Sequence, residues 1–227
     1  MEINGDTKTI DDKIWINKDV LVKWEISDIV EDKDCSGLSS ISVKVNDIEI
    51  ENQDFSQNKK DEVSVEFNTN ILQSNDDGSI VIRIIAIDNT GNRDEKTHVI
   101  YRDLDRPELT VEYDNNTPDS VFNEFYKEDR ILTLKIKEMN FDPSLINVMI
   151  SKNGSFMNPN LQWQLVSGIS GTINAVYQTK LMFNEDADYE IYVSGKDMLD
   201  FDLNNFYDKF VLDKTKPTLN VSYDNNN

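Results

Sequence analysis

One segment of this chain occurs twice. Residues 107–116 and 217–226 share the pattern Pro-x-Leu-x-Val-x-Tyr-Asp-Asn-Asn, and the two copies begin 110 residues apart. A repeat of this length is too long for the unit of a solenoid and is close to the size of one small domain. The chain is therefore expected to contain tandem copies of one module.

The position of the repeat sets the expected module boundaries. The 227 residues hold two modules of this size, each long enough to bury its own core. We predict a first module over residues 1–105, a second over 106–216, and the start of a third, truncated module over 217–227. The segment 101–107 between the modules contains neither Gly nor Ser, and Pro107 fixes φ at the entrance to the next strand, which predicts a stiff connection.

Apolar residues alternate with polar ones wherever they cluster, which is typical of half-buried strands. Asn46-Asp47 and Asn153-Gly154 predict tight turns between strands, and 142–145 is long enough for only one helical turn. With about seven short strands per module, the sequence predicts an all-β fold of two tandem immunoglobulin-like β-sandwich domains. The expected strands are 20–26, 41–45, 48–50, 63–67, 80–87, 97–101, 132–136, 146–150, 161–165, 173–183, 189–193 and 206–212.

Two motifs in the first module carry a family resemblance. Residues 86–92 read Ala-Ile-Asp-Asn-Thr-Gly-Asn and are followed by Asp-Leu-Asp-Arg-Pro at 103–107, while Ser-Gly-Leu at 36–38 leads into an earlier strand. This combination resembles the bacterial Ig-like repeat domains, which occur in tandem in bacterial surface and secreted proteins as stalks or adhesive modules. The resemblance implies an extracellular or cell-surface location, with neighbouring modules of the same chain as partners.

The residues of the first motif also have a simple structural interpretation. Asp88 and Asn89 are expected to hydrogen-bond backbone amides of their own turn, and Gly91 to supply a positive φ. The second module departs from the motif, because residues 195–205 keep Asp197 but lack the Gly-Asn pair. Its loop at 198–206 is rich in apolar residues, and it either tucks under the end of the sandwich or presents an apolar contact surface.

The charge of the chain argues against several kinds of partner. Forty-three acidic and 23 basic residues give a formal net charge of −20, spread over both modules. Such a surface repels nucleic acid and anionic lipid, so neither is an expected partner. Because no run of 18 apolar residues occurs, direct membrane insertion is not expected either. We predict a monomer.

Residues for catalysis or metal binding are sparse. The single histidine, His98, falls in a predicted strand, and the single cysteine, Cys35, falls in the polar turn 32–37 with no His near it. We therefore predict no enzyme, and no catalytic, cofactor-binding or metal residues. Calcium is the alternative, because Asp28, Asp88, Asp103 and Asp105 are expected to converge at one end of module one, although no D-x-D-x-D-G spacing occurs.

Aromatic residues are the remaining candidates for ligand binding. Trp24 and Trp163 alternate with aliphatic residues and are expected in the cores, whereas the sequence does not show whether Trp15 is buried. A glycan-binding module places two or three rings in a row on an exposed face, because sugar faces stack on aromatic rings. The candidates do not form such a row in the sequence, so core packing is favoured for them: Phe125, Tyr126, Tyr177 and Tyr192.

Three functions remain after these exclusions. The first is a non-enzymatic structural or adhesive repeat region, a stalk or spacer, of a bacterial surface or secreted protein. The second is a ligand-binding module that takes a host protein or glycan through loops at one end of a sandwich, including residues 198–206. The third is an accessory domain of a secreted carbohydrate-active enzyme.

Overall fold

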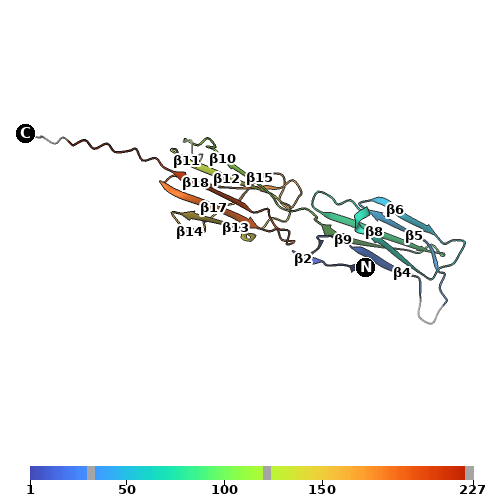
Figure 1. The fold of residues 1–227 in the computed structure, drawn as a ribbon. Helices are drawn as coiled ribbons and strands as arrows, with labels where there is room; N and C mark the ends of the chain where they lie inside the picture. Colours follow the sequence, from blue (N-terminus) through green and yellow to red (C-terminus); the bar gives the residue numbers. More distant parts are fainter. Residues whose placement is uncertain (30–33, 120–123, 223–227) are drawn as a thin grey trace, which may run out of the picture. The chain divides into compact units, whose positions relative to one another are not determined.

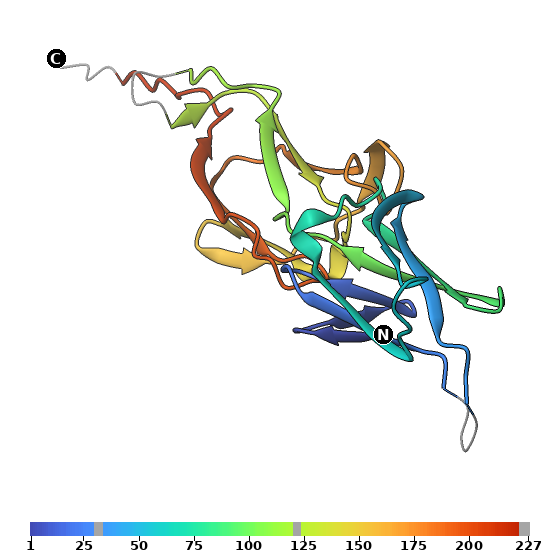
Figure 2. The same cartoon turned by 90° about the vertical axis from the view of Figure 1, so that its right-hand side faces the viewer.

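A computed structural model describes residues 1–29, 34–119 and 124–222 of the chain. Regular structure in these ranges consists of β-strands and two short 3₁₀ turns, which confirms the all-β prediction. None of the helical segments described has the length and apolar character needed to cross a bilayer. The chain divides into two compact units: unit 1 comprises Met1–Asp105 with Ser170–Asn174, and unit 2 comprises Arg106–Ile169 with Ala175–Asn227. In Figure 1 and Figure 2 unit 1 carries the blue and green strands, and unit 2 the strands from yellow-green to red.

Unit 1 is built from two sheets. The larger has the order β2 (Lys8–Ile10), β3 (Lys13–Ile16), β9 (Arg93–Arg102), β8 (Ser79–Asp88), β5 (Leu38–Val45) and β6 (Ile48–Asp54). The smaller has the order β1 (Glu2–Asn4), β4 (Leu21–Ser27) and β7 (Glu62–Asn68), and the 3₁₀ turn η1 (Thr69–Ile71) follows β7. Neighbouring strands are antiparallel except for β3 and β9, which are parallel.

The core of unit 1 comes from both sheets, as in a sandwich. Val22 and Trp24 of β4 and Val65 of β7 pack in one cluster with Ile41 of β5 and Ile82 of β8. Alternate residues of β4 point into this cluster, which is why the period-two pattern predicted the strand. Trp24 is 5% exposed and so lies in the core as predicted, and Trp15, which the sequence left open, is also buried.

Unit 2 also has two sheets. One has the order β10 (Glu108–Tyr113), β12 (Arg130–Lys137), β16 (Val176–Phe183) and β15 (Gln164–Ser167). The other has the order β11 (Phe125–Tyr126), β18 (Phe206–Leu212), β17 (Ala187–Gly195), β13 (Ile146–Lys152) and β14 (Ser155–Met157). Its core joins apolar residues of both sheets, including Leu132, Leu134 and Ile136 of β12 with Val148, Ile191 and Phe210.

The predicted turns have the expected backbone. Asn46 and Asp47 have φ of 47° and 65°, and Asn153 and Gly154 have φ of 50° and 77°. Both pairs therefore adopt the positive φ values that a two-residue hairpin turn of type I′ needs. The single helical turn expected at 142–145 is the 3₁₀ turn η2 (Pro143–Leu145), with Asp142 as its N-cap.

Some strand boundaries were predicted wrongly in unit 2. Strand β15 begins at Gln164 instead of residue 161, because Leu161 and Trp163 pack on the core from the loop before the strand. Strand β16 begins at Val176 instead of residue 173. Strand β14, which continues the hairpin after Gly154, was not predicted. An alternation of apolar residues indicates which side chains are buried, not whether the backbone forms a strand. A loop that lies over a core can therefore show the same alternation as a strand.

The two copies of the repeat differ in structure. The first copy forms β10, which pairs with β12 from Glu108 to Tyr113. In the second copy, the described residues 217–222 contain no strand, and Leu219 and Val221 are 87% and 64% exposed. Residues 223–226, which complete the second copy, lie outside the described residues. The start of a third module therefore stays a prediction.

Candidate functional site

The turn between β8 and β9 is held by the side chain of Asp88. Its Oδ1 accepts hydrogen bonds from the backbone N of Thr90 and of Asn92, both at 2.8 Å, and its Oδ2 accepts one from Asn92 Nδ2 at 2.7 Å. Desolvation raises the pKa of Asp88, but the hydrogen bonds from Asn92 and Thr90 outweigh it and lower the pKa from 3.8 to about 2. Gly91 has a φ of 88°, as predicted. This carboxylate is therefore occupied in shaping its own turn.

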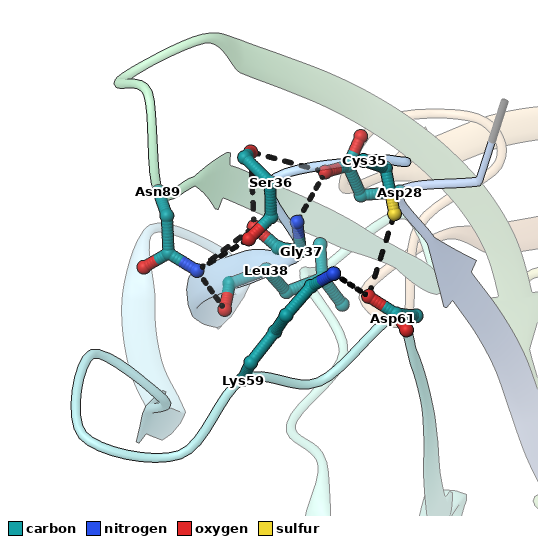
Figure 3. Close-up of polar contacts among 8 residues, drawn as sticks. All are labelled: Asp28, Cys35, Ser36, Gly37, Leu38, Lys59, Asp61 and Asn89. Carbon is teal, nitrogen blue, oxygen red and sulfur yellow. Dashed lines mark hydrogen bonds and ion pairs between the residues drawn. The ribbon is translucent and has the colours of Figure 1, made fainter. Parts of the chain in front are cut away.

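Asn89 connects the two motifs that carry the family resemblance. Its Nδ2 lies 3.0, 3.1 and 3.3 Å from the carbonyl oxygens of Ser36, Gly37 and Leu38, and its backbone N donates to Gly37 O at 3.0 Å (Figure 3). Asp28 completes the arrangement, because its Oδ2 accepts from Gly37 N at 2.8 Å and from Ser36 Oγ at 3.2 Å. The segments after β4, at the start of β5 and between β8 and β9 are thus held together at one end of unit 1. Asn89 was expected to bond the amides of its own turn, but its side chain donates to carbonyl oxygens about fifty residues earlier in the chain.

Cys35 lies beside this arrangement, next to Asp61 and Lys59 (Figure 3). Its Sγ is 3.4 Å from Asp61 Oδ1, and Lys59 Nζ is 3.2 Å from the same oxygen. Desolvation and the neighbouring Asp61 raise the pKa of the Cys35 thiol. A raised pKa reduces the thiolate fraction, which is the reactive form, so the chemistry of this site disfavours a nucleophile. Residues 32 and 33 of the same predicted turn lie outside the described residues.

The four carboxylates of the alternative calcium site do not converge in unit 1. The register of β8 and β9 pairs Ser79 with Tyr101 at one end and Ile87 with Arg93 at the other. Asp88 and Asp28 therefore lie at the hairpin end, whereas Asp103 and Asp105 follow β9 at the opposite end. Asp28 already accepts hydrogen bonds from Ser36 and Gly37, and Asp88 from the amides of its own turn. The sequence could not show this separation because it depends on strand direction.

Unit 2 contains two buried carboxylates that lie close together. An oxygen of Glu138 and one of Asp197 are within 4.8 Å of each other, and the residues are 5% and 1% exposed. Glu138 Oε1 accepts from Asn140 N at 2.7 Å, and Asp197 Oδ1 accepts from Leu199 N at 2.7 Å and Phe201 N at 2.9 Å. Carboxylates are ligands for hard cations, so Glu138 and Asp197 each offer an oxygen that can contribute to holding one. These hydrogen bonds come from backbone amides of the turns that follow Glu138 and Asp197.

The loop at 198–206 tucks inward, which decides between the two alternatives left open by the sequence. Leu199 and Leu203 are 1% and 3% exposed, and Leu203 belongs to the core of unit 2. Leu203 N donates to Gly195 O at 2.8 Å, and the Asp197 side chain holds the preceding turn. Of the two alternatives, burial at the end of the sandwich therefore holds for Leu199 and Leu203, and these side chains do not form an apolar contact surface.

Arg130, the first residue of β12, is buried among aromatic rings of unit 2. It is 3% exposed, and its Cζ lies 3.8 Å from the centre of the Tyr113 ring and 3.7 Å from that of Tyr126. Its Nε donates to the backbone oxygen of Asn115 at 2.9 Å. Tyr113 OH donates to Asp208 at 2.7 Å, and desolvation together with this bond raises the Tyr113 pKa. Tyr113 and Asn115, which belong to the first copy of the repeat, thus have structural roles.

Three aromatic rings form a row on the outward face of the β11-β18-β17-β13-β14 sheet. The ring centres of Phe156 and Tyr192 are 6.2 Å apart, and those of Tyr192 and Tyr207 are 4.8 Å apart. Phe156 is 60% and Tyr207 52% exposed. The hydrogen bond from Tyr192 OH to Glu190 at 2.9 Å, with desolvation and the neighbouring Tyr207, raises the pKa of Tyr192 to about 12. We refer to Phe156, Tyr192 and Tyr207 as the aromatic row.

Of the four aromatic candidates, only Tyr192 belongs to the aromatic row, so the core packing expected for Tyr192 is wrong. Phe125 is 36% exposed and is not in the core either. Tyr126 is buried in the core and Tyr177 stacks on Phe141 at 4.2 Å, as core packing predicts. Tyr192, in contrast, faces outward and meets rings from β14 and β18. A signal existed in the sequence, because Tyr192 and Tyr207 occupy the polar phase of strands whose other phase is apolar.

The remaining aromatic and titratable candidates are in ordinary strand positions. His98 lies on β9 opposite Ile82, and desolvation lowers its pKa. Its ring is 6.2 Å from that of Trp24, which is the environment of a strand-face residue. Trp163 packs against the core of unit 2, with its ring 5.3 Å from Phe141. A pocket of about 280 Å³ lies beside it, lined also by Leu161, Ile146 and Asn147.

Comparison with known proteins adds no relative. No protein-family model matches this chain, and no curated protein matches it in sequence.

Proposed function

We propose that this chain is a non-enzymatic structural or adhesive repeat region, a stalk or spacer made of immunoglobulin-like sandwiches, from a bacterial surface or secreted protein. The observation that supports this most directly is the use of the motif residues. Asp88, Asn89 and Asp28 hold turns and connect strands, and Tyr113 and Asn115 of the repeat enclose Arg130. In the sequence, Asp28 and Asp88 suggest a metal site. In the structure, these polar residues hold turns and strands of the two units in place.

Two further observations agree with a spacer. Each unit has a core of its own drawn from two sheets, so each is equipped to fold as a module. The segment that connects β9 to β10 is short and ends in Pro107, which limits the freedom of the chain there. The family resemblance of the two motifs in unit 1 supplies the proposed bacterial surface or secreted origin.

A mechanical experiment tests the spacer role. The whole chain, held at its two ends and stretched, is expected to unfold in two separate steps. Each step should release a contour length of about 350 Å, which is the extended length of roughly 105 residues. Refolding after relaxation should restore both steps. A single step, or gradual extension without a peak, would contradict two modules that bear tension.

An array of host proteins tests the second candidate function. Saturable binding that disappears when residues 198–206 are replaced by a Gly/Ser loop of equal length would favour a recognition module over a spacer. Because Leu203 contributes to the core, the replacement must be checked for folding by its circular dichroism spectrum. A second replacement that keeps Leu199 and Leu203 but changes the exposed Asp202, Asn204 and Asn205 separates recognition from loss of structure.

A further inference from the structure

The aromatic row has the composition of a ligand-binding surface. Tyr192 of β17 lies between Ile191 and Val193, and Tyr207 of β18 follows Phe206; these neighbours pack in the core, so both tyrosines point away from it. Phe156 of β14 lies opposite Ser151 and is out of phase with the core residue Ile150. Outward positions of a sheet that faces solvent are usually polar. Two of the rings are more than half exposed, so their large apolar faces remain in contact with water.

Polar groups accompany the rings. Glu190 lies opposite Lys209 on the same face. Ser151 lies between Phe156 and Glu190 across the strands, but it is only 3% exposed, so Glu190 and Lys209 are the polar groups that a ligand can reach. Glu190 accepts the hydrogen bond from Tyr192 OH, which fixes the orientation of the tyrosine. The surface therefore alternates flat apolar faces with hydrogen-bond donors and acceptors. A sugar ring has the matching composition, with an apolar C–H face and hydroxyl groups around its edge.

The exposed area of the aromatic row favours a small ligand. Each aromatic side chain covers about 150–250 Å², so the exposed fractions leave roughly 300 Å² of aromatic surface. A stable protein interface needs about 800 Å² on each partner, with a core depleted of charge. Glu190 and Lys209 interrupt the apolar area here. Both facts favour a narrow ligand over a second protein or a second copy of this chain.

The angles between the rings of the aromatic row and the net charge of the chain narrow the class of ligand. The interplanar angles are 50° between Phe156 and Tyr192 and 39° between Tyr192 and Tyr207, so the rings follow the twist of the sheet instead of forming a flat platform. Because the rings are tilted against one another, they can contact one flexible polymer ligand better than the flat face of a crystalline polymer. The net charge of −20 repels polyanions.

We propose that the aromatic row binds a single, soluble, uncharged glycan chain, whose successive sugar rings stack on Tyr207, Tyr192 and Phe156 while Glu190 and Lys209 hydrogen-bond their hydroxyl groups. This function goes beyond the spacer role and does not rest on it. The glycan lies across the strands, because the three rings come from three strands of the sheet. No covalent step is involved.

Calorimetric titration of the full chain tests this proposal. The probes are soluble neutral oligosaccharides of two to six units from five series: gluco-, manno-, galacto-, xylo- and N-acetylglucosamine oligomers. At least one series is expected to bind saturably and more tightly as the chain lengthens from two units. The variants Tyr207→Ala and Phe156→Ala should each weaken that binding roughly threefold to tenfold. Tyr207→Phe keeps the ring and should retain most of it.

Met182→Ala provides a matched control. Met182 is a 61% exposed apolar residue on β16, in the other sheet of unit 2, and its truncation should leave glycan binding unchanged. Thermal melting of each variant shows whether it is folded. The proposal is overturned if no neutral series binds, or if both alanine variants bind as the native chain does. Binding only to anionic glycans, or self-association abolished by Tyr207→Ala, also overturns it.

Discussion

At the scale of single residues, Arg130 shows how a charge is accommodated in the core of unit 2. Its guanidinium group lies between the rings of Tyr113 and Tyr126 and 4.4 Å from the centre of the Phe210 ring. A planar guanidinium stacks on two rings at once, whereas the ammonium group of lysine is compact and strongly hydrated. The stacking, more than the charge alone, therefore makes arginine suited to this position.

We expect Arg130→Lys to lower the free energy of unfolding of unit 2 by about 1–3 kcal/mol, because it removes stacking and the hydrogen bond to Asn115. Urea denaturation of the full chain, followed by far-ultraviolet circular dichroism, measures this change. Lys135→Ala is the control, because its ion pair with Glu112 lies at the surface and should contribute less than about 1 kcal/mol. Equal effects of the two substitutions would contradict the stacking interpretation.

Asp88 leads to a prediction about pH. Its pKa is about 2 in the folded chain against an ordinary value of 3.8, so its carboxylate stabilises the fold at pH values above 3.8. This contribution is lost as the pH falls from 3.8 towards 2. Asp88→Asn keeps a hydrogen-bond acceptor and removes the titration, so melting temperatures measured between pH 5 and pH 2 should fall less steeply. Asp94→Asn, at an exposed position on β9, should keep the native slope.

At the scale of elements, Asn89 joins the β8–β9 turn to the start of β5. Its amide reaches three successive carbonyl oxygens, so Asn89→Ala should leave these acceptors without that donor and destabilise unit 1 by about 1–2 kcal/mol. Tryptophan fluorescence during urea unfolding measures the change in a Trp163→Phe background, where only Trp15 and Trp24 of unit 1 report. Asn58→Ala, at an exposed turn position, is the control and should shift the midpoint little.

The elements also show what a sequence can predict. Strands such as β4 and β12 were predicted because one face of each is buried, and period two records this directly. The same pattern misplaced the start of β15, where Trp163 is held over the core by a loop. The Asn89 contacts to Ser36 and Gly37 could not be predicted, since they join residues about fifty positions apart whose proximity depends on strand order.

The candidate sites follow the same logic. The sequence correctly identified Asp88 and Gly91 as turn residues because their contacts are local. It wrongly brought Asp103 and Asp105 to the same end as Asp88, because only the antiparallel register of β8 and β9 separates them. The aromatic row was missed for a related reason: Phe156, Tyr192 and Tyr207 meet across strands, although each is out of phase with the apolar residues of its own segment.

At the scale of the whole molecule, the chain carries two separate cores. Buried residues of unit 1 form one cluster around Ile82, and those of unit 2 form another around Leu134. Both side chains are fully buried, and truncating such a residue to alanine removes packing and leaves a cavity that costs about 2–5 kcal/mol. Since the clusters share no residue, each cost should remain within the unit that contains the substitution.

Hydrogen exchange of the full chain, measured by mass spectrometry, tests this expectation. Ile82→Ala should accelerate exchange in the strands β4, β5, β7, β8 and β9 and leave β12, β13, β16, β17 and β18 at their native rates, and Leu134→Ala should do the reverse. Val99→Ala, at a 40% exposed position on β9, serves as the surface control. If either core substitution lowers protection in both units together, the chain unfolds as one cooperative body, and the tandem-module basis of the proposed spacer is lost.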